Sequence, residues 1–169
     1  MGNFDALIRE QIPRLRRYAR ALVSDRTLAD DLVQDTLERA LTKFHLWRHG
    51  SDLRAWLFSI MHNVHIDQVR NRMAKPSETL EDDAAEPSTR ATQADHLEVR
   101  DLDESLKRLP DEQREILLLV ALEQMTYEEV AKVLRIPVGT VMSRLSRGRE
   151  KLRAVMEGRS LINPLRVVK

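Results

Sequence analysis

Residues 75–96 divide the chain into two parts, and this division constrains the fold more than any other feature of the sequence. The segment is polar and carries two basic against six acidic side chains, without any apolar period. Such a composition buries too little apolar surface to offset the entropy lost on ordering. We therefore predict a flexible acidic linker at 75–96 between two small folded units, residues 1–74 and 97–160, with a C-terminal tail at 161–169.

Both units are predicted to be helical, which makes the protein all-α. In the first unit, apolar residues recur at helical spacing in three stretches, the third of which runs from Leu53 towards Arg72. Pro13 should kink or restart the first helix. Thr27 and Asp30 resemble a capping box at the start of the second helix.

The second unit is predicted to end in a helix-turn-helix. A short helix with Leu102 and Leu106 should stop at Pro110, and an apolar helix follows. Thr126 and Glu129 form a capping box before a helix of about nine residues. The chain then turns into a second, arginine-rich helix. Small Ala131 would let the two helices approach closely, while Ile136 fills the corner between them.

The arginine-rich helix is predicted to bind DNA. Residues 135–153 carry six basic side chains against one acidic, which suits a groove lined by phosphates. A basic surface helix alone is more often a solvated face, but the capped helix and the turn before it favour DNA. Arg135 stands at a turn position where glycine is common, so we expect the turn to be slightly strained there. The predicted DNA-contacting residues are Thr140, then Met142, Ser143 and Ser146 near base edges, and Arg144, Arg147 and Arg149 at phosphates.

Composition excludes several other classes of protein. The net charge of +1 hides two basic ends, with 12 basic against 9 acidic residues in 1–74 and 14 against 12 in 97–169. There is no cysteine, so disulfides and thiolate metal sites are excluded. No charge-free apolar run approaches the roughly 20 residues of a membrane span, and the N-terminus lacks a signal-peptide core. We expect a cytoplasmic protein without direct membrane insertion.

An enzyme is the first alternative. His62 and His65 are spaced for a shared metal ion and Asp67 is nearby, but no further ligand stands at a convincing position. The sequence has no glycine-rich phosphate loop and no nucleophile motif. We therefore predict a binding protein with no catalytic residues, no metal and no cofactor.

Four motifs resemble those of the extracytoplasmic-function sigma factors of bacterial RNA polymerase. They are residues 29–37 (Ala-Asp-Asp-Leu-Val-Gln-Asp-Thr-Leu), residues 54–60 with Asn63, residues 109–115 (Leu-Pro-Asp-Glu-Gln-Arg-Glu), and residues 127–131 with 138–144. Their order along the chain is that of the family. The resemblance implies a sigma region two at 1–74 and a sigma region four at 97–160, which recognises the minus-35 element.

The resemblance also implies partners and site residues. Core RNA polymerase would contact the second helix through Asp30, Asp31, Gln34, Asp35 and Arg39. The melting region of promoter DNA would contact Trp47, Asn63, Asp67, Arg70 and Arg72. Trp56 falls on the apolar stripe and is expected in the core, which leaves Trp47 as the freer tryptophan. Family members are commonly held inactive by an anti-sigma factor, and we expect one here, released by a stress or environmental signal.

The alternative within the binding proteins is an autonomous helix-turn-helix regulator that acts without core polymerase. Such a regulator would not need the acidic second helix or the tryptophan-bearing basic helix of the first unit. We therefore favour a factor that binds core RNA polymerase and directs promoter recognition and transcription initiation.

Overall fold

The computed structural model describes residues 2–75 and 93–162. These residues form α-helices and one short 3-10 helix, with no strand in the described ranges, so the all-α prediction is confirmed. The elements are α1 (Gly2–Leu22), α2 (Arg26–Thr42), η1 (Phe44–Leu46), α3 (Leu53–Ala74), α4 (Gln93–Lys107), α5 (Asp111–Ala121), α6 (Tyr127–Leu134) and α7 (Val138–Ile162). Most of the predicted linker and tail lies outside the described residues. The last part of that linker, 93–96, is helical in α4, which begins well before Leu102.

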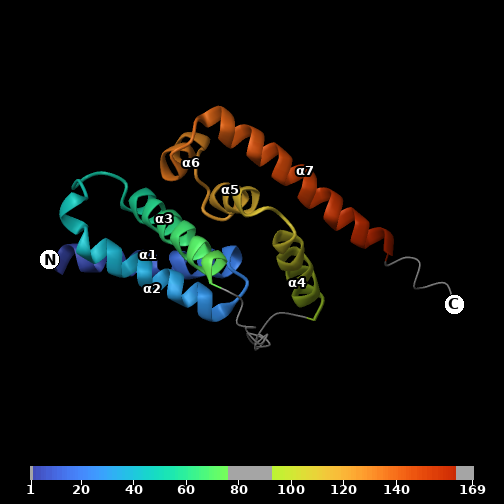
Figure 1. Cartoon of the computed structure of the whole chain (residues 1–169), viewed down its shortest axis with the longest axis horizontal. Coiled ribbons are helices and arrows are strands. Elements are labelled where there is room, and N and C mark those ends of the chain that lie inside the picture. The colour runs from blue at the N-terminus through green and yellow to red at the C-terminus, as the bar shows by residue number, and fades with distance from the viewer. Residues whose placement is uncertain (1, 76–92, 163–169) are drawn as a thin grey trace.

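Helices α1, α2 and α3 form the first bundle (Figure 1). Their apolar stripes meet in a core in which Leu15, Leu32, Leu57 and Met61 are fully buried. Helix α1 is continuous through Pro13, so the expected restart is wrong. Proline removes one backbone donor, but buried residues on both sides, such as Ile8 and Leu15, hold the helix on the bundle.

The start of α2 also differs from the prediction. Asp25 is the N-cap, and its Oδ1 accepts a hydrogen bond of 3.0 Å from the Leu28 backbone N–H. Thr27 already lies inside the helix, so the capping box that we predicted from Thr27 and Asp30 is wrong. Aspartate at the N-cap satisfies one of the free backbone donors and adds a favourable negative charge at the positive end of the helix.

Helices α5, α6 and α7 form the predicted helix-turn-helix unit. Ile116 of α5, Val130 of α6 and Val141 of α7 are fully buried together with Leu145. Gly148 marks the crossing of α5 and α7, because a Cβ there would lie 3.3 Å from side-chain atoms of Gln113 and Leu117. The predicted capping box of α6 is confirmed: Thr126 Oγ1 accepts from the Glu129 backbone N–H at 3.2 Å, and Glu129 Oε2 accepts from the Thr126 N–H at 2.9 Å.

The turn after α6 passes through Arg135, which adopts the left-handed conformation with φ 55° and ψ 47°. This geometry confirms the expectation of strain at that position, because a Cβ disfavours it. We predict that Arg135→Gly raises the free energy of unfolding by about 0.5–1 kcal/mol. Urea denaturation measures the change. Lys132→Gly, placed inside α6, should instead lower the free energy of unfolding by about 1 kcal/mol, and a destabilising Arg135→Gly would contradict the prediction.

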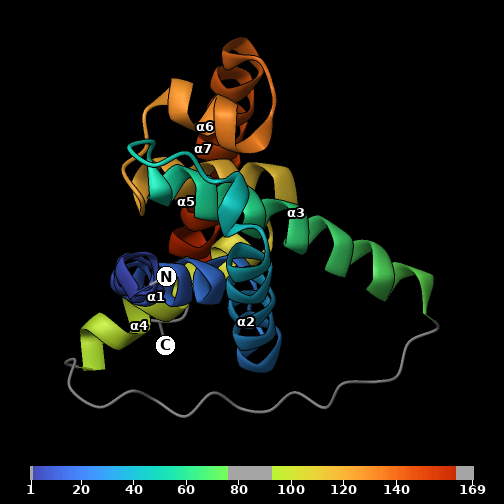
Figure 2. The ribbon, with the colours of Figure 1, turned by 90° about the vertical axis from the view of Figure 1, so that its left-hand side faces the viewer.

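The two bundles are in direct contact. Helices α1 and α3 pack against α5 and α6, while α4 lies beside α7 (Figures 1 and 2). Figure 2 shows the second half of α3 extending away from the second bundle. Within the described residues, no helix is both long enough and apolar enough to pass through a membrane.

Candidate nucleic-acid and protein interfaces

The predicted DNA-contacting residues follow one exposed side of α7. Met142 is 53% exposed, and Ser143, Ser146, Arg147 and Arg149 are also exposed. Val141 and Leu145 point to the opposite side and are buried under α5 and α6. The helix is therefore fixed by its apolar side and offers its polar side to a partner, as recognition helices do.

Two of the predicted residues on α7 are partly buried. Thr140 lies in the first turn, and its carbonyl oxygen accepts a hydrogen bond of 3.2 Å from the Ser143 hydroxyl. Arg144 Nε lies 3.8 Å from Glu112 Oε2 of α5, so this guanidinium already has a nearby carboxylate. Glu112 is mostly exposed, and such a surface pair is worth at most about 1 kcal/mol. Arg144 thus remains available for a phosphate.

The residues predicted to bind polymerase separate into two groups. Asp30, Asp31 and Gln34 are exposed on α2. Asp30 and Gln34 border a hollow of about 800 Å³ between α1 and α2, lined by Arg16, Arg20, Asp30, Val33, Gln34, Leu37, Glu38 and Leu41. This hollow combines both signs of charge with the half-exposed Leu41, a mixture that suits the side of a partner helix.

The other two predicted polymerase-binding residues are tied to α3. Asp35 Oδ2 accepts a hydrogen bond of 2.8 Å from the Gln68 amide, and Arg39 Nη1 lies 3.0 Å from Asp67 Oδ2. Asp67 is one of the residues predicted to contact melting DNA, so the structure pairs a predicted DNA residue with a predicted polymerase residue. These contacts connect the two candidate surfaces of the first bundle.

Of the residues predicted to contact melting DNA, Asn63, Arg70 and Arg72 are exposed on α3. Arg72 Nε donates to the backbone oxygen of Gln68 at 3.3 Å, one turn earlier on the same helix. Asn63 and Arg70 lie seven residues apart on the same side of α3, whereas Arg72 lies about half a turn round the helix from them.

Trp47 does not lie where we expected it. Its side chain is buried, and its ring centroid is 5.5 Å from that of Phe4, in an aromatic cluster that also contains Phe44 and Trp56. Trp56 is only partly buried, so the expectation that Trp47 is the freer tryptophan is wrong. The 3-10 turn of η1 places Trp47 against α1. Removing this large apolar ring from water stabilises the folded state.

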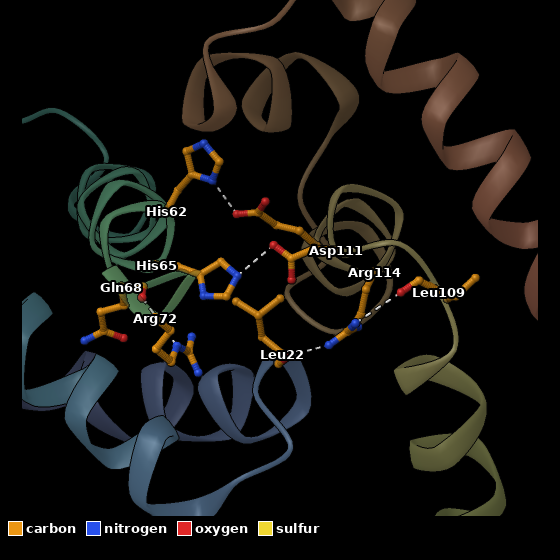
Figure 3. A network of polar contacts seen from close by, with 9 residues as sticks. Leu22, His62, His65, Gln68, Arg72, Leu109, Asp111 and Arg114 are labelled. Atoms are coloured by element: carbon orange, nitrogen blue, oxygen red, sulfur yellow. Dashed lines mark hydrogen bonds and ion pairs between the residues drawn. The ribbon is translucent and has the colours of Figure 1, made fainter. Parts of the chain in front are cut away.

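The two histidines of α3 face α5 (Figure 3). His62 Nδ1 forms a hydrogen bond with Glu115 Oε1, and His65 Nε2 lies 2.9 Å from Asp111 Oδ2. Sequence reasoning did not predict either pair. In the described part of the chain, no group of three histidine or carboxylate side chains is placed to hold a metal ion.

Asp111 shows the electrostatic effect of this contact. Burial raises the pKa of its carboxyl group, but the hydrogen bond and charge of His65, with the charges of Arg114 and Arg72, outweigh burial and hold the pKa below its usual value. The ionised form is therefore stabilised by residues of both bundles. A lowered pKa contributes stability above the ordinary pKa of a carboxyl group, and this stability is lost as the pH falls through the lowered value.

Tyr18 of α1 lies near the same acidic residues, and its pKa responds to them. Its ring packs edge-on against Phe58 at 5.0 Å and is 2% exposed. Burial, followed by the charges of Glu115, Asp111 and Glu123, raises the pKa of the phenol well above its usual value. The environment therefore favours the protonated phenol over the phenolate.

We predict that stability falls in alkaline solution because of Tyr18. A raised pKa contributes stability that is complete below the ordinary pKa of about 10 and is lost as the pH rises through the folded-state value. Thermal unfolding between about pH 9 and about pH 11 should show this loss. In Tyr18→Phe the phenol is absent, so the alkaline decline should be smaller. An equal decline in Tyr18→Phe and in the wild type would contradict the assignment.

Comparison with known proteins agrees with the two-bundle architecture. Residues 8–62 match the family described as the Sigma2 domain of PhyR, and residues 100–152 match the family described as Sigma-70, region 4. The chain is 37% identical over 145 residues to the ECF RNA polymerase sigma factor EcfG of Rhodopseudomonas palustris, covering 86% of this chain and 80% of that protein. It is 32% identical over 143 residues to the ECF RNA polymerase sigma factor SigM of Bacillus subtilis, covering 82% and 86%.

Solved structures resemble both bundles together. The sigma factor RpoE of Bartonella quintana, crystallised with the anti-sigma factor NepR, is 32% identical, with a TM-score of 0.80 over 93% of this chain and 98% of that chain. CnrH, solved in complex with the cytosolic domain of CnrY, is 29% identical, with a TM-score of 0.69 over 92% and 88%. Because these matches cover nearly the whole chain, they extend to the arrangement of the two bundles.

Proposed function

The chain belongs to the extracytoplasmic-function family of RNA polymerase sigma factors, and on that premise we propose that it binds core RNA polymerase and directs promoter recognition and transcription initiation. The observation that carries this proposal is the presence of both halves of the family in one chain, with a polar exposed side on α7. Residues 1–74 act as region two, 75–96 connect the domains, and 97–160 act as region four.

We assign the sites as follows. In region four, α7 enters the major groove of the minus-35 element. Met142, Ser143 and Ser146 lie nearest the base edges, and Arg147 and Arg149 contact phosphates together with Arg144. In region two, Asn63, Arg70 and Arg72 contact the strand that is exposed on melting. Asp30, Asp31 and Gln34 dock on polymerase beside the hollow between α1 and α2, whereas Asp35, Arg39 and Asp67 support these surfaces through α3.

The factor acts by binding, and the reaction that it starts is catalysed by polymerase. An anti-sigma factor would hold it inactive in the cytoplasm, as the structures of related sigma factors with NepR and CnrY suggest. Melting by binding is physically sufficient, because unstacking a base costs only a few kcal/mol and contacts to the extruded base offset this cost.

Run-off transcription tests the proposal. Purified bacterial core polymerase is incubated with a genomic promoter library, with and without the chain, and the RNA products are sequenced. We expect transcripts from a defined set of promoters only when the chain is present. If the chain enables no initiation, and binds its DNA equally tightly without polymerase, it is an autonomous regulator and the proposal is wrong.

A further inference from the structure

The contact between the two domains is electrically polarised. In the described residues, four contacts between a basic side chain and a carboxylate join the two domains, and each places its nitrogen on region two and its carboxylate on region four. They are His62–Glu115, His65–Asp111 at 2.9 Å, Arg17–Glu123 at 3.5 Å and Arg54–Glu129 at 3.6 Å. We call Arg17, Arg54, His62 and His65 the basic face, and Asp111, Glu115, Glu123 and Glu129 the acidic face.

The two arginines of the basic face also bind backbone oxygens at the end of α5. Arg17 Nη2 donates to the Leu122 oxygen at 3.3 Å, and Arg54 Nη1 donates to the Glu123 oxygen at 2.8 Å. The carbonyl groups at a helix C-terminus carry partial negative charge. The basic face therefore contacts negative groups of two kinds, carboxylates and carbonyl groups at a helix end. One hydrogen bond has its donor on region four: Arg114 Nη1 donates to the Leu22 oxygen at 2.9 Å.

Burial makes part of this contact costly to hold, although the side chains of Asp111 and Glu129 are 45% and 35% exposed. The side chains of Glu123 and Glu115 are 0% and 7% exposed, and that of His65 is 3% exposed. Oε2 of Glu123 and Nδ1 of His65 have no hydrogen-bond partner. A buried polar atom without a partner costs about 1–3 kcal/mol. The contact is thus complementary in charge but incompletely satisfied, which favours its exchange for another anionic partner.

The basic face adjoins the DNA-contacting residues that we propose for region two. His62 is next to Asn63 in sequence, and Arg72 is two turns beyond His65 on α3. Figure 3 shows His62, His65 and Arg72 on this helix, with both histidines turned towards α5. Seven residues separate His65 from Arg72, so these two share a side of α3, whereas Asn63 lies on another side of the helix. If α5 and α6 moved away, the nitrogens of the basic face would be exposed together with Arg72.

We propose that the basic face is a further binding surface of region two for the phosphate backbone of DNA, and that the carboxylates of region four cover it in the free chain. The proposal rests on the proposed function, in which region two binds promoter DNA. The carboxylates occupy positions that phosphates take in the DNA complex. Region four and DNA therefore compete for the same nitrogens, and DNA binding by this surface requires the domains to separate.

Charge removal on the acidic face tests the proposal. In the full chain, Asp111→Asn, Glu115→Gln and Glu123→Gln remove three carboxylates with little change of shape. The probe is a fluorescently labelled duplex of random sequence, because phosphate contacts do not depend on sequence. Anisotropy is measured over a series of salt concentrations. We expect about tenfold tighter binding and a log–log salt slope steeper by about 2, from the two arginines released.

A second variant tests whether the arginines of the basic face cause the gain in DNA binding. Adding Arg17→Gln and Arg54→Gln to the triple variant should return both affinity and salt slope to the wild-type values. A charge-matched control, Glu10→Gln with Glu98→Gln and Glu157→Gln, gives the same net charge on exposed positions of α1, α4 and α7 and should leave the salt slope within about one unit of the wild type. Equal gains in this control and in the acidic-face variant would overturn the proposal.

Domain separation is measured in the same variants. Because the chain has no cysteine, Thr42→Cys and Lys132→Cys provide single dye positions on exposed sites of α2 and α6. Energy transfer should fall in the acidic-face variant and in the combined variant alike. If the domains separate without any gain in DNA binding, or if they stay together, the proposal is wrong. Run-off transcription by the wild-type chain is scored separately, so a failure here with initiation intact leaves the proposed function standing.

Discussion

Reversing the charge of Asp30 and Asp31 is expected to separate the factor from core polymerase. Both carboxylates are exposed on α2, and no contact of the described structure uses them to hold the fold. Arginines in their place would face the basic groups of a partner that complements this acidic helix. Like charges placed together at an interface cost several kcal/mol, and about 3 kcal/mol corresponds to more than a hundredfold loss of affinity. Co-purification with core polymerase and run-off transcription should both be lost.

The control for this experiment reverses two exposed acids elsewhere, Glu10→Arg with Glu157→Arg. It makes the same change in net charge and should retain polymerase binding. Asp35→Arg is a poorer probe, because Asp35 accepts a hydrogen bond from Gln68 and its loss would disturb α3. Circular dichroism should show both double variants folded with similar melting temperatures. Polymerase binding retained by Asp30→Arg with Asp31→Arg would remove this surface from the proposed function.

Local signals in the sequence were sufficient for most of the helices. The capping box of Thr126 and Glu129 was predicted correctly, because both partners lie within one helical turn. The strained turn at Arg135 was also predicted, since a single residue must take the left-handed conformation there. Buried Val141 and Leu145 followed from their spacing on α7. Each of these features depends on residues close in sequence.

Features that depend on distant contacts were missed. Trp47 is buried because η1 turns it onto Phe4, a contact between residues more than forty positions apart. The pairs of His62 and His65 with α5 join residues on opposite sides of the predicted linker. A histidine spacing on one helix indicates which side chains share a side of that helix, but it does not indicate what lies opposite. For the same reason the roles of Asn63, Arg70 and Arg72 stay predictions.

The start of α2 was missed for a different reason. Asp25, Thr27 and Asp30 are all acceptable near a helix N-terminus, so several N-caps compete in the sequence. The structure selects Asp25, which begins α2 two residues before Thr27. The residue at which a helix begins sets its length and not the side on which its later side chains lie. The positions of Asp31 and Gln34 on the exposed side of α2 therefore follow from the apolar stripe and not from the cap.

Removing two arginines of α7 should weaken DNA binding without changing the preferred sequence. Arg147 and Arg149 are exposed, and neither has an ion-pair partner among the described contacts. In Arg147→Ala with Arg149→Ala, two phosphate contacts are lost, so the salt slope should become shallower by about 2 and affinity at low salt should fall at least tenfold. The loss should be similar for the selected promoter sequence and for unrelated duplexes, as measured by anisotropy.

Ser143→Ala provides the matched contrast on the same side of α7. Ser143 is exposed one turn from the start of the helix, where base edges are nearest. A hydroxyl that reads a base affects one position of the DNA, so its removal should leave the salt slope unchanged and reduce discrimination at that position by about 1–3 kcal/mol. Binding to a library of minus-35 variants measures this. If Ser143→Ala weakens all sequences equally, or if the arginine variant changes the preferred sequence, α7 does not lie in the groove in the orientation that its apolar side implies.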